Sequence, residues 1–116
     1  MIDASCHCGA VRLEIDAAPP DAVTSCNCSI CRRLGTLWAY YPPAQVAIRG
    51  DTATYVWGDK ALALHRCSVC GVPTHWSSLT GLERMGVNAR IMALDVEAIR
   101  VRYLDGADTW TYRDEE

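Results

Sequence analysis

Seven cysteines gathered into three short clusters constrain this chain more than any other feature of its sequence. The clusters are Cys6-His7-Cys8, Cys26-Asn27-Cys28-Ser29-Ile30-Cys31 and Cys67-Ser68-Val69-Cys70, and no cysteine lies outside them. Thiolates are preferred zinc ligands, and tetrahedral sites commonly take them in C-x-C or C-x-x-C pairs. Because a closed set of disulfides cannot use an odd number of cysteines, we expect two zinc sites instead. Four cysteines would close one site, and three would leave a fourth position open at the other.

The length of 116 residues is that of one domain, and we expect residues 1–116 to form a single zinc-binding domain. The sequence starts without a basic segment followed by an apolar one, and no apolar stretch is long enough to span a bilayer. Cysteines in this number then indicate the metal ligands of a cytoplasmic protein rather than a disulfide framework. Two metal ions would also stabilise a modest core that contains no Phe.

The charge of the chain argues against nucleic acid as a partner. Its formal net charge is -3, and its Lys and Arg residues are scattered without a basic run. Such a chain attracts nucleic acid only weakly. We therefore expect no nucleic-acid partner. Because no apolar stretch is long enough to span a bilayer, we expect no membrane partner either. The sequence carries no signal of oligomeric state.

Short apolar and alternating segments predict a mainly β fold. The segment Val11-Arg12-Leu13-Glu14-Ile15 alternates apolar and polar residues, as a half-buried strand does, and Gly58-Asp59 predicts a hairpin turn. Two short helices are expected to begin at the caps Ser29 and Asp95. We expect short antiparallel strands in a small, zinc-stapled, β-sandwich-like domain. The predicted helices are 29–33 and 95–99, and the predicted strands are 11–15, 37–41, 46–48, 53–57, 61–67, 73–76, 84–89 and 101–104.

The spacing of the cysteines leaves open which of them share an ion. Cys67-x-x-Cys70 followed by Gly71 is typical of a zinc knuckle, which supplies two ligands and needs two more. Economy favours the Cys6/Cys8 pair as its partner, because the remaining three cysteines are close enough in sequence to hold one ion together. On spacing alone, the partner pair is Cys6/Cys8, Cys26/Cys28 or Cys28/Cys31.

The same clusters carry a resemblance to a known family. The segments concerned are Cys6-His7-Cys8-Gly9-Ala10-Val11, Cys26-Asn27-Cys28-Ser29-Ile30-Cys31-Arg32-Arg33, Cys67-Ser68-Val69-Cys70-Gly71, Gly86-Val87-Asn88-Ala89-Arg90 and Tyr103-Leu104-Asp105-Gly106. Together they resemble the glutathione-dependent formaldehyde-activating enzyme family, which includes centromere protein V. The resemblance spans almost the whole chain. The chain departs from the family in carrying His65-Arg66 just before the knuckle, where an aromatic residue is usual.

The resemblance implies a fold, a pair of cofactors and an activity. It implies a mainly β fold similar to that of the methionine-R-sulfoxide reductases, with two zinc ions. The implied activity is that of a zinc-dependent carbon–sulfur lyase acting on a thiol–aldehyde adduct, such as S-hydroxymethylglutathione formed from glutathione and formaldehyde. The implied structural zinc is held by Cys6, Cys8, Cys67 and Cys70, and the implied catalytic zinc is held by Cys26, Cys28 and Cys31.

Residues near the three-cysteine cluster indicate how a thiol substrate would be held. Cys31 is expected in the first turn of a short helix, where the helix dipole favours a thiolate. Arg32 and Arg33 follow it, and either can pair with a carboxylate of glutathione or remain solvated at the surface. Asn88 and Arg90 are expected to share one face of a strand, where they would line a substrate pocket or decorate the wet face of the sheet.

The histidines and the aromatic residues admit two interpretations each. His75 is the best candidate among the three histidines for a proton shuttle beside the substrate. In the plainer interpretation, the three-cysteine cluster is a second structural site that His7, His65 or His75 closes. The aromatic residues of segment 38–41 are expected to pack in the core, since the chain has no Phe, and the other interpretation is that they wall a substrate cleft.

Two other functions stand beside the lyase. A non-enzymatic zinc module that binds a partner protein is favoured by the lack of an obvious general base and by the ease with which thiol–aldehyde adducts form unaided. A redox or metal-buffering protein would instead oxidise the three-cysteine cluster and release its zinc. The lyase is the leading hypothesis.

Overall fold

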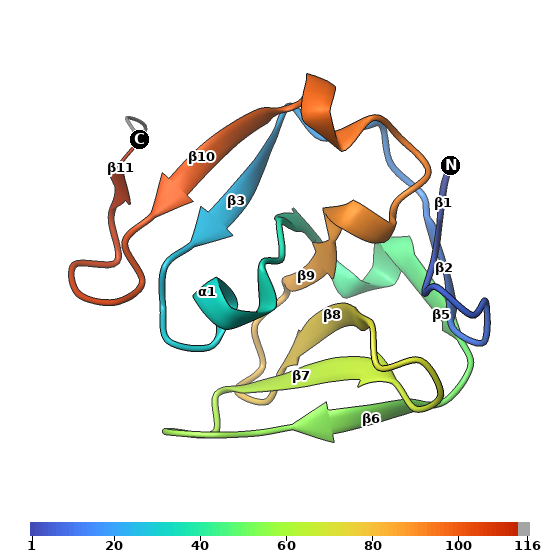
Figure 1. Ribbon diagram of the computed structural model, residues 1–116, viewed down its shortest axis with the longest axis horizontal. Coiled ribbons are helices and arrows are strands. Elements are labelled where there is room, and N and C mark those ends of the chain that lie inside the picture. Colours follow the sequence, from blue (N-terminus) through green and yellow to red (C-terminus); the bar gives the residue numbers. More distant parts are fainter. Residues whose placement is uncertain (114–116) are drawn as a thin grey trace.

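Strands make up most of the regular structure in the computed structural model, which describes residues 1–113 (Figure 1). The predicted mainly β fold is confirmed. Strands β1 (Ile2–Ser5), β2 (Arg12–Ile15) and β5 (Val46–Arg49) form a small antiparallel sheet in the order β1-β2-β5. The larger sheet has the order β11-β10-β3-β4-β9-β8-β7-β6. Its strands are β3 (Ala22–Cys26), β4 (Trp38–Tyr41), β6 (Thr52–Tyr55), β7 (Leu62–Cys67), β8 (Pro73–Ser78), β9 (Met85–Asn88), β10 (Arg100–Leu104) and β11 (Tyr112–Arg113).

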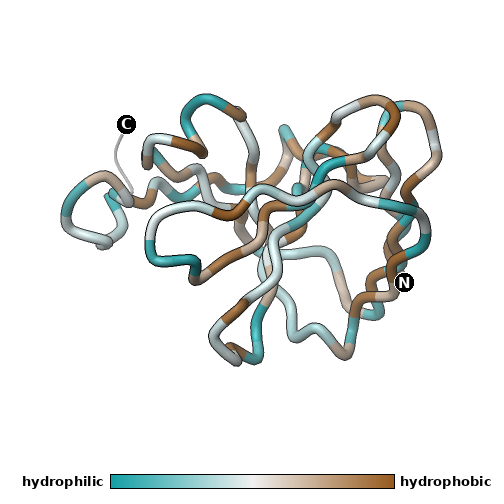
Figure 2. The backbone as a smooth tube through the Cα atoms, turned by 90° about the horizontal axis from the view of Figure 1, so that it is seen from below, coloured by the Kyte–Doolittle hydropathy of each residue, from teal (hydrophilic) through white to brown (hydrophobic). Residues whose placement is uncertain are grey.

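One buried cluster joins the small sheet to the central strands of the larger sheet. On β2, Leu13 and Ile15 are buried while Arg12 and Glu14 are exposed, so the alternation predicted for this strand turns one face inward. Figure 2 shows the alternation as brown and teal stretches on the strands near the N-terminus. Other members of the cluster are Val11, Val23, Leu37, Val87 and Ala89.

One pair of strands in the larger sheet is parallel, in contrast to the antiparallel pairing expected throughout. Strand β10 runs beside β3 in the same direction, with Leu104 opposite Cys26 (Figure 1). Parallel neighbours need a long crossover, and the chain between these two contains β4 to β9. The pairing brings the segment that follows β10 to the end of β3, where Cys26 lies.

The helix predicted at 29–33 forms, but it begins later than predicted. Helix α1 (Cys31–Leu34) starts after Ile30, whose backbone is already helical, and no side chain caps it. The prediction that Ser29 caps this helix is therefore wrong. The helix ends at Gly35, whose left-handed backbone (φ 70°) is the usual ending of a helix. Cys31 is thus the first residue of α1.

The remaining helical segments are single 3₁₀ turns. The one predicted at 95–99 is η3 (Val96–Ala98), and the side chain of Asp95 accepts a hydrogen bond from the Glu97 N–H, as predicted for a cap. The others are η1 (Pro43–Gln45) and η2 (Ala89–Ile91). Within residues 1–113, the helices all lack the length and apolar character needed to cross a membrane.

An aromatic cluster lies beside the main core and depends on one glycine. Trp38, Leu64 and Trp76 are buried together, and the ring centroids of Trp76 and Tyr40 lie 6.0 Å apart. The Trp76 indole lies over Gly86 on the neighbouring strand, and a Cβ at position 86 would collide with its Nε1. The indole can occupy this position only because residue 86 has no side chain.

We predict that Gly86→Ala lowers the free energy of unfolding by about 1–3 kcal/mol, because the added methyl group would displace the Trp76 indole. Urea unfolding followed by circular dichroism measures the change. In a Trp76→Leu background the same substitution should cost less than about 1 kcal/mol, since the colliding atoms are gone. An equal cost in both backgrounds would contradict the proposed contact.

Candidate metal centres

The thiols of the first and third clusters meet at one point of the structure. Cys6, Cys8, Cys67 and Cys70 form a four-cysteine group that could hold a metal ion. The Cys8 sulfur lies 3.7 Å from that of Cys6 and 3.6 Å from that of Cys67. These separations are close to the edge of about 3.8 Å that a tetrahedron with metal–sulfur bonds of about 2.3 Å would have. They are much longer than a disulfide bond of about 2.05 Å, and all seven cysteines of the chain are free.

Backbone N–H groups point at the sulfurs of the four-cysteine group. The N–H of Val11 donates to the Cys6 sulfur over 3.3 Å, and the N–H groups of Val69 and Cys70 donate to the Cys67 sulfur over 3.3 and 3.4 Å. A backbone N–H donor at Val72 lowers the pKa of the Cys70 thiol to about 6. Donors in this arrangement favour thiolates, which is the form that binds metal.

The three cysteines of the middle cluster form the second group. Cys26, Cys28 and Cys31 bring their sulfurs within 4.8 Å of one another, and the group could hold a metal ion. Strand β3 ends at Cys26 and helix α1 begins at Cys31, so the group lies on the connection between these two elements. Among residues 1–113, the group contains no His, Asp or Glu that would complete a set of four ligands.

Hydrogen-bond donors also surround the three-cysteine group. The Cys31 N–H donates to the Cys28 sulfur over 3.4 Å, and the indole Nε1–H of Trp38 donates to the Cys31 sulfur over 3.4 Å. A hydrogen bond from the Cys31 thiol, together with backbone donors at Cys28 and Gly106, lowers the pKa of Cys26 to about 6. Donation to Cys26, together with burial, raises the pKa of Cys31.

A hollow of about 370 Å³ opens beside the three-cysteine group. Cys26 and Cys31 form part of its wall, and three arginines surround it, so its charge favours an anion. The wall also includes Thr36, which is buried and whose hydroxyl has no hydrogen-bond partner within residues 1–113. Buried polar atoms normally have a partner, and this hydroxyl is an exception among the described residues. The charged and aromatic residues of the wall are Arg32, Arg90, Arg113 and Tyr103.

The two arginines that follow Cys31 have different surroundings. Arg32 lines the hollow, whereas Nη1 of Arg33 donates to the Ser29 carbonyl within the same turn of chain. Arg90 also lines the hollow, where its Nε donates to the Gly35 carbonyl over 2.8 Å. The structure therefore brings Arg32 and Arg90 to the three-cysteine group, and it keeps Arg33 apart from them.

The alternation predicted that Asn88 and Arg90 share one face of a strand, but the structure shows that they do not. Strand β9 ends at Asn88, and the chain turns into η2, which carries Arg90. Asn88 is buried, its Nδ2 donates to the Pro73 carbonyl, and its Oδ1 accepts from the Arg90 N–H. Both ends of this amide are used to hold the turn, and Asn88 is not part of the hollow's wall.

His75 lies in the interior, next to another histidine. Its ring stacks on that of His65 with centroids 4.1 Å apart, and its Nδ1 lies 2.8 Å from the Thr74 hydroxyl. Burial and the neighbouring His65 lower the pKa of His75 to about 3, so the ring is neutral at physiological pH. Neither histidine lines the hollow beside the three-cysteine group, and we do not propose His75 as a proton shuttle.

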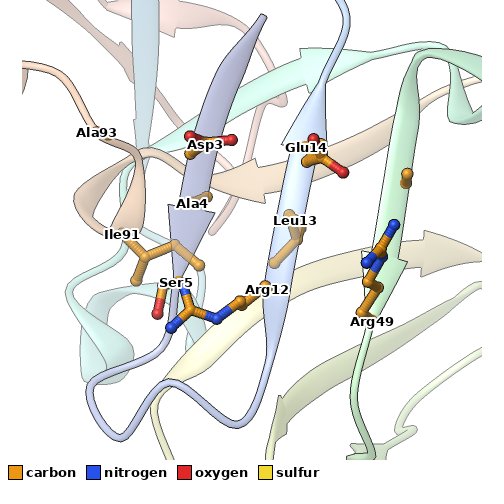
Figure 3. A pocket seen from close by; sticks show the side chains of 10 residues that line it. Asp3, Ala4, Ser5, Arg12, Leu13, Glu14, Arg49, Ile91 and Ala93 are labelled. Atoms are coloured by element: carbon orange, nitrogen blue, oxygen red, sulfur yellow. The ribbon is translucent and has the colours of Figure 1, made fainter.

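Another hollow lies on the outer face of the small sheet and lacks thiols. Figure 3 shows Asp3 and Glu14 at one end of it, on neighbouring strands, and Arg12 reaching toward Ser5 at the other end. Arg49 stands opposite Arg12 in the register of β2 and β5. The charged side chains that line this hollow are exposed, so water screens their charges. The chemistry of this chain therefore points to the hollow at the three-cysteine group.

The fold and the two thiol groups define a small β protein with two candidate metal centres. The chain belongs to the GFA family, described as Glutathione-dependent formaldehyde-activating enzyme, whose sequence model matches residues 1–111. The family resemblance carried by the cysteine clusters is thereby confirmed.

Two individual relatives share about 30% of their residues with this chain over the matched segments. A protein of Halomonas elongata, named "Putative glutathione-dependent formaldehyde-activating enzyme", is 30% identical over 73 residues. The match covers 62% of this chain and 44% of that protein, so the chain spans less than half of its relative's length. The crystal structure of a Rhodobacter sphaeroides protein matches with a TM-score of 0.73 at 29% identity, and the match covers 83% of this chain and 93% of that one.

We predict that Cys67→Ser removes the metal ion from the four-cysteine group and destabilises the fold by roughly 4 kcal/mol or more. The reason is that Cys67 is buried and joins β7 to the loop that carries Cys6 and Cys8, and the loss of a structural metal is among the costliest changes. Metal content by mass spectrometry and thermal unfolding measure the two effects. Val69→Ala is the matched control, because this side chain is 77% exposed in the same turn. A Cys67→Ser protein with unchanged stability would contradict a structural role.

Proposed function

We propose that this protein is a zinc-dependent carbon–sulfur lyase that joins the thiol of glutathione to formaldehyde and cleaves the same adduct in reverse. The observation that carries the proposal is the three-cysteine group at the edge of an arginine-lined hollow. Membership of the GFA family supports glutathione and formaldehyde as the substrates. A hollow of about 370 Å³ also falls in the size range of small-molecule sites.

The proposed reaction is redox-neutral. The sulfur of glutathione forms a bond to the formaldehyde carbon, the carbon–oxygen double bond becomes single, and the thiol proton ends on the new hydroxyl oxygen. The product is S-hydroxymethylglutathione, and the reaction needs no oxidant or reductant. What the protein has to supply is a thiolate, which is the nucleophilic form of a thiol, held at a fixed place.

The donor sets of both thiol groups fit zinc. Zinc prefers thiolate ligands, and structural sites are closed by four protein ligands while catalytic sites keep a position open. Cys6, Cys8, Cys67 and Cys70 would hold the structural ion, and Cys26, Cys28 and Cys31 the catalytic one. When bound by the three cysteines, zinc would supply a Lewis acid that favours the thiolate form of a substrate thiol.

The residues of the hollow supply orientation. Glutathione carries two carboxylates, and we propose that Arg32 and Arg90, two of the three arginines in the wall of the hollow beside Cys26 and Cys31, receive them. With the carboxylates held in this way, the sulfur of the tripeptide would be presented to the three-cysteine group.

We predict that Cys31→Ser abolishes the acceleration of exchange between formaldehyde and S-hydroxymethylglutathione while the domain stays folded. Cys31 belongs only to the three-cysteine group, so the four-cysteine group should retain its metal. Two-dimensional exchange NMR on glutathione and formaldehyde measures the rate with the zinc-loaded protein. If neither protein accelerates exchange, the lyase assignment fails and a non-enzymatic zinc module takes its place. Full activity in Cys31→Ser would contradict the role given to the three-cysteine group.

We predict that Arg32→Ala and Arg90→Ala each raise the KM for glutathione five- to tenfold, which corresponds to about 1–1.4 kcal/mol of binding free energy. Each change removes one charge-assisted hydrogen bond to a carboxylate at a partly solvated position. Steady-state exchange rates at varied glutathione concentration give the KM. Arg33→Ala is the control and should change the KM less than twofold, because Arg33 is turned toward Ser29. Equal effects at all three positions would point to a general charge effect instead.

A further inference from the structure

The loop that follows β10 is fastened to the three-cysteine group by Asn27. This residue stands between Cys26 and Cys28, and its Nδ2 donates to Asp105 Oδ1 over 3.1 Å. Its Oδ1 accepts from the Ala107 N–H over 2.9 Å, and its own N–H donates to the Leu104 carbonyl over 3.2 Å. The loop of residues 105–111, here called the 105–111 loop, is therefore held against the cysteines by both ends of one amide.

Gly106 allows this loop to approach the sulfur of Cys26. A Cβ at position 106 would collide with the Cys26 sulfur, and it would lie 3.3 Å from Cβ of Cys28 and 3.3 Å from Cζ3 of Trp110. Gly106 is buried at this contact. The space that a side chain would occupy is thus shared between two candidate metal ligands and the indole of Trp110.

Trp110 is unusual both in its backbone and in its exposure. Its φ of 57° lies in the left-handed region, where a residue with a side chain is strained. The conformation is held by the Trp110 N–H, which donates to the Asp105 carbonyl over 2.7 Å. Yet the side chain is 66% exposed, so burial of its own ring does not account for the strain. Strained residues of this kind concentrate at binding and active sites.

We propose that the 105–111 loop, which follows the wall residues Tyr103 and Leu104, extends the substrate site beyond the hollow and that Trp110 contacts the substituent carried on the substrate's sulfur. The proposal rests on the proposed function, because it places the sulfur of a glutathione adduct at the three-cysteine group. The indole offers a large, rigid, apolar face close to Cys26 and Cys28. The site accordingly prefers glutathione adducts whose sulfur carries an apolar or aromatic group over adducts that carry a single carbon.

Stable thioethers of glutathione test this preference with the zinc-loaded protein. S-methylglutathione and S-benzylglutathione share the tripeptide and differ only in the group on sulfur. We expect isothermal titration calorimetry to give S-benzylglutathione a Kd about tenfold lower, because the indole removes part of its phenyl ring from water. Trp110→Ala should reduce this ratio to less than threefold and change the Kd of S-methylglutathione less than twofold. Trp110→Phe should retain most of the preference.

The control variant is Asp108→Ala, which changes an exposed residue of the same loop and should leave both Kd values within twofold of the wild type. A wild-type protein without the preference, or a Trp110→Ala protein that keeps it, would overturn the inference. Either result leaves the lyase intact as long as exchange of formaldehyde and glutathione is accelerated. Failure of the wild type to bind both thioethers, together with an absence of accelerated exchange, would overturn the inference and the proposed function alike.

Discussion

The convergence of thiols from distant segments is the constraint on which the rest of this structure depends. The four-cysteine group brings the turn after β1 next to the end of β7 and the turn that follows it. Thiols crowded this closely repel one another once ionised, and backbone N–H groups offset that repulsion only in part. A metal ion at the group would supply the missing positive charge, and its binding would add directly to the stability of the fold.

The second thiol group owes its position to the parallel pairing of β3 with β10. This pairing puts Leu104 beside Cys26, and Asn27 then fastens the 105–111 loop across the cysteines. The other side of the group is built by α1 and by Trp38, whose indole donates to Cys31. The site is therefore assembled from β3, α1, β4 and the turn after β10. A hollow with arginines in its wall adjoins it.

Much of this arrangement could be predicted from the sequence, because cysteine spacing and short-range alternation are local signals. The hairpin of β6 and β7 and the strands β2, β4, β5, β8 and β10 follow the predicted segments closely. Strand β3 was not predicted, since polar and apolar residues do not alternate regularly in Ala22–Cys26. Thr24, a polar residue, is buried in this strand, which the sequence alone does not indicate. The parallel partner of β3 is far away in sequence, and no local pattern encodes such a pairing.

The residues around the three cysteines were harder to predict for the same reason. Arg32 lies next to a cysteine in sequence, and it lines the hollow. Asn27 has a role that depends on Asp105 and Ala107, which only the folded chain brings close. Asn88 carried a signal that was misread, because the strand ends there and its amide holds the turn into η2. The Tyr103-Leu104-Asp105-Gly106 segment was part of the family pattern, and its contact with Cys26 explains why a glycine stands at position 106.

X-ray absorption at the zinc edge tests the central claim, which is one closed site and one open site, most directly. With both groups loaded, a closed four-sulfur site and an open three-sulfur site predict an average of about 3.5 sulfur ligands per zinc. Addition of glutathione should raise this average to about 4, as its sulfur takes the open position. An average of 4 before glutathione is added, or one that glutathione does not change, would contradict an open thiol-binding site at Cys26, Cys28 and Cys31.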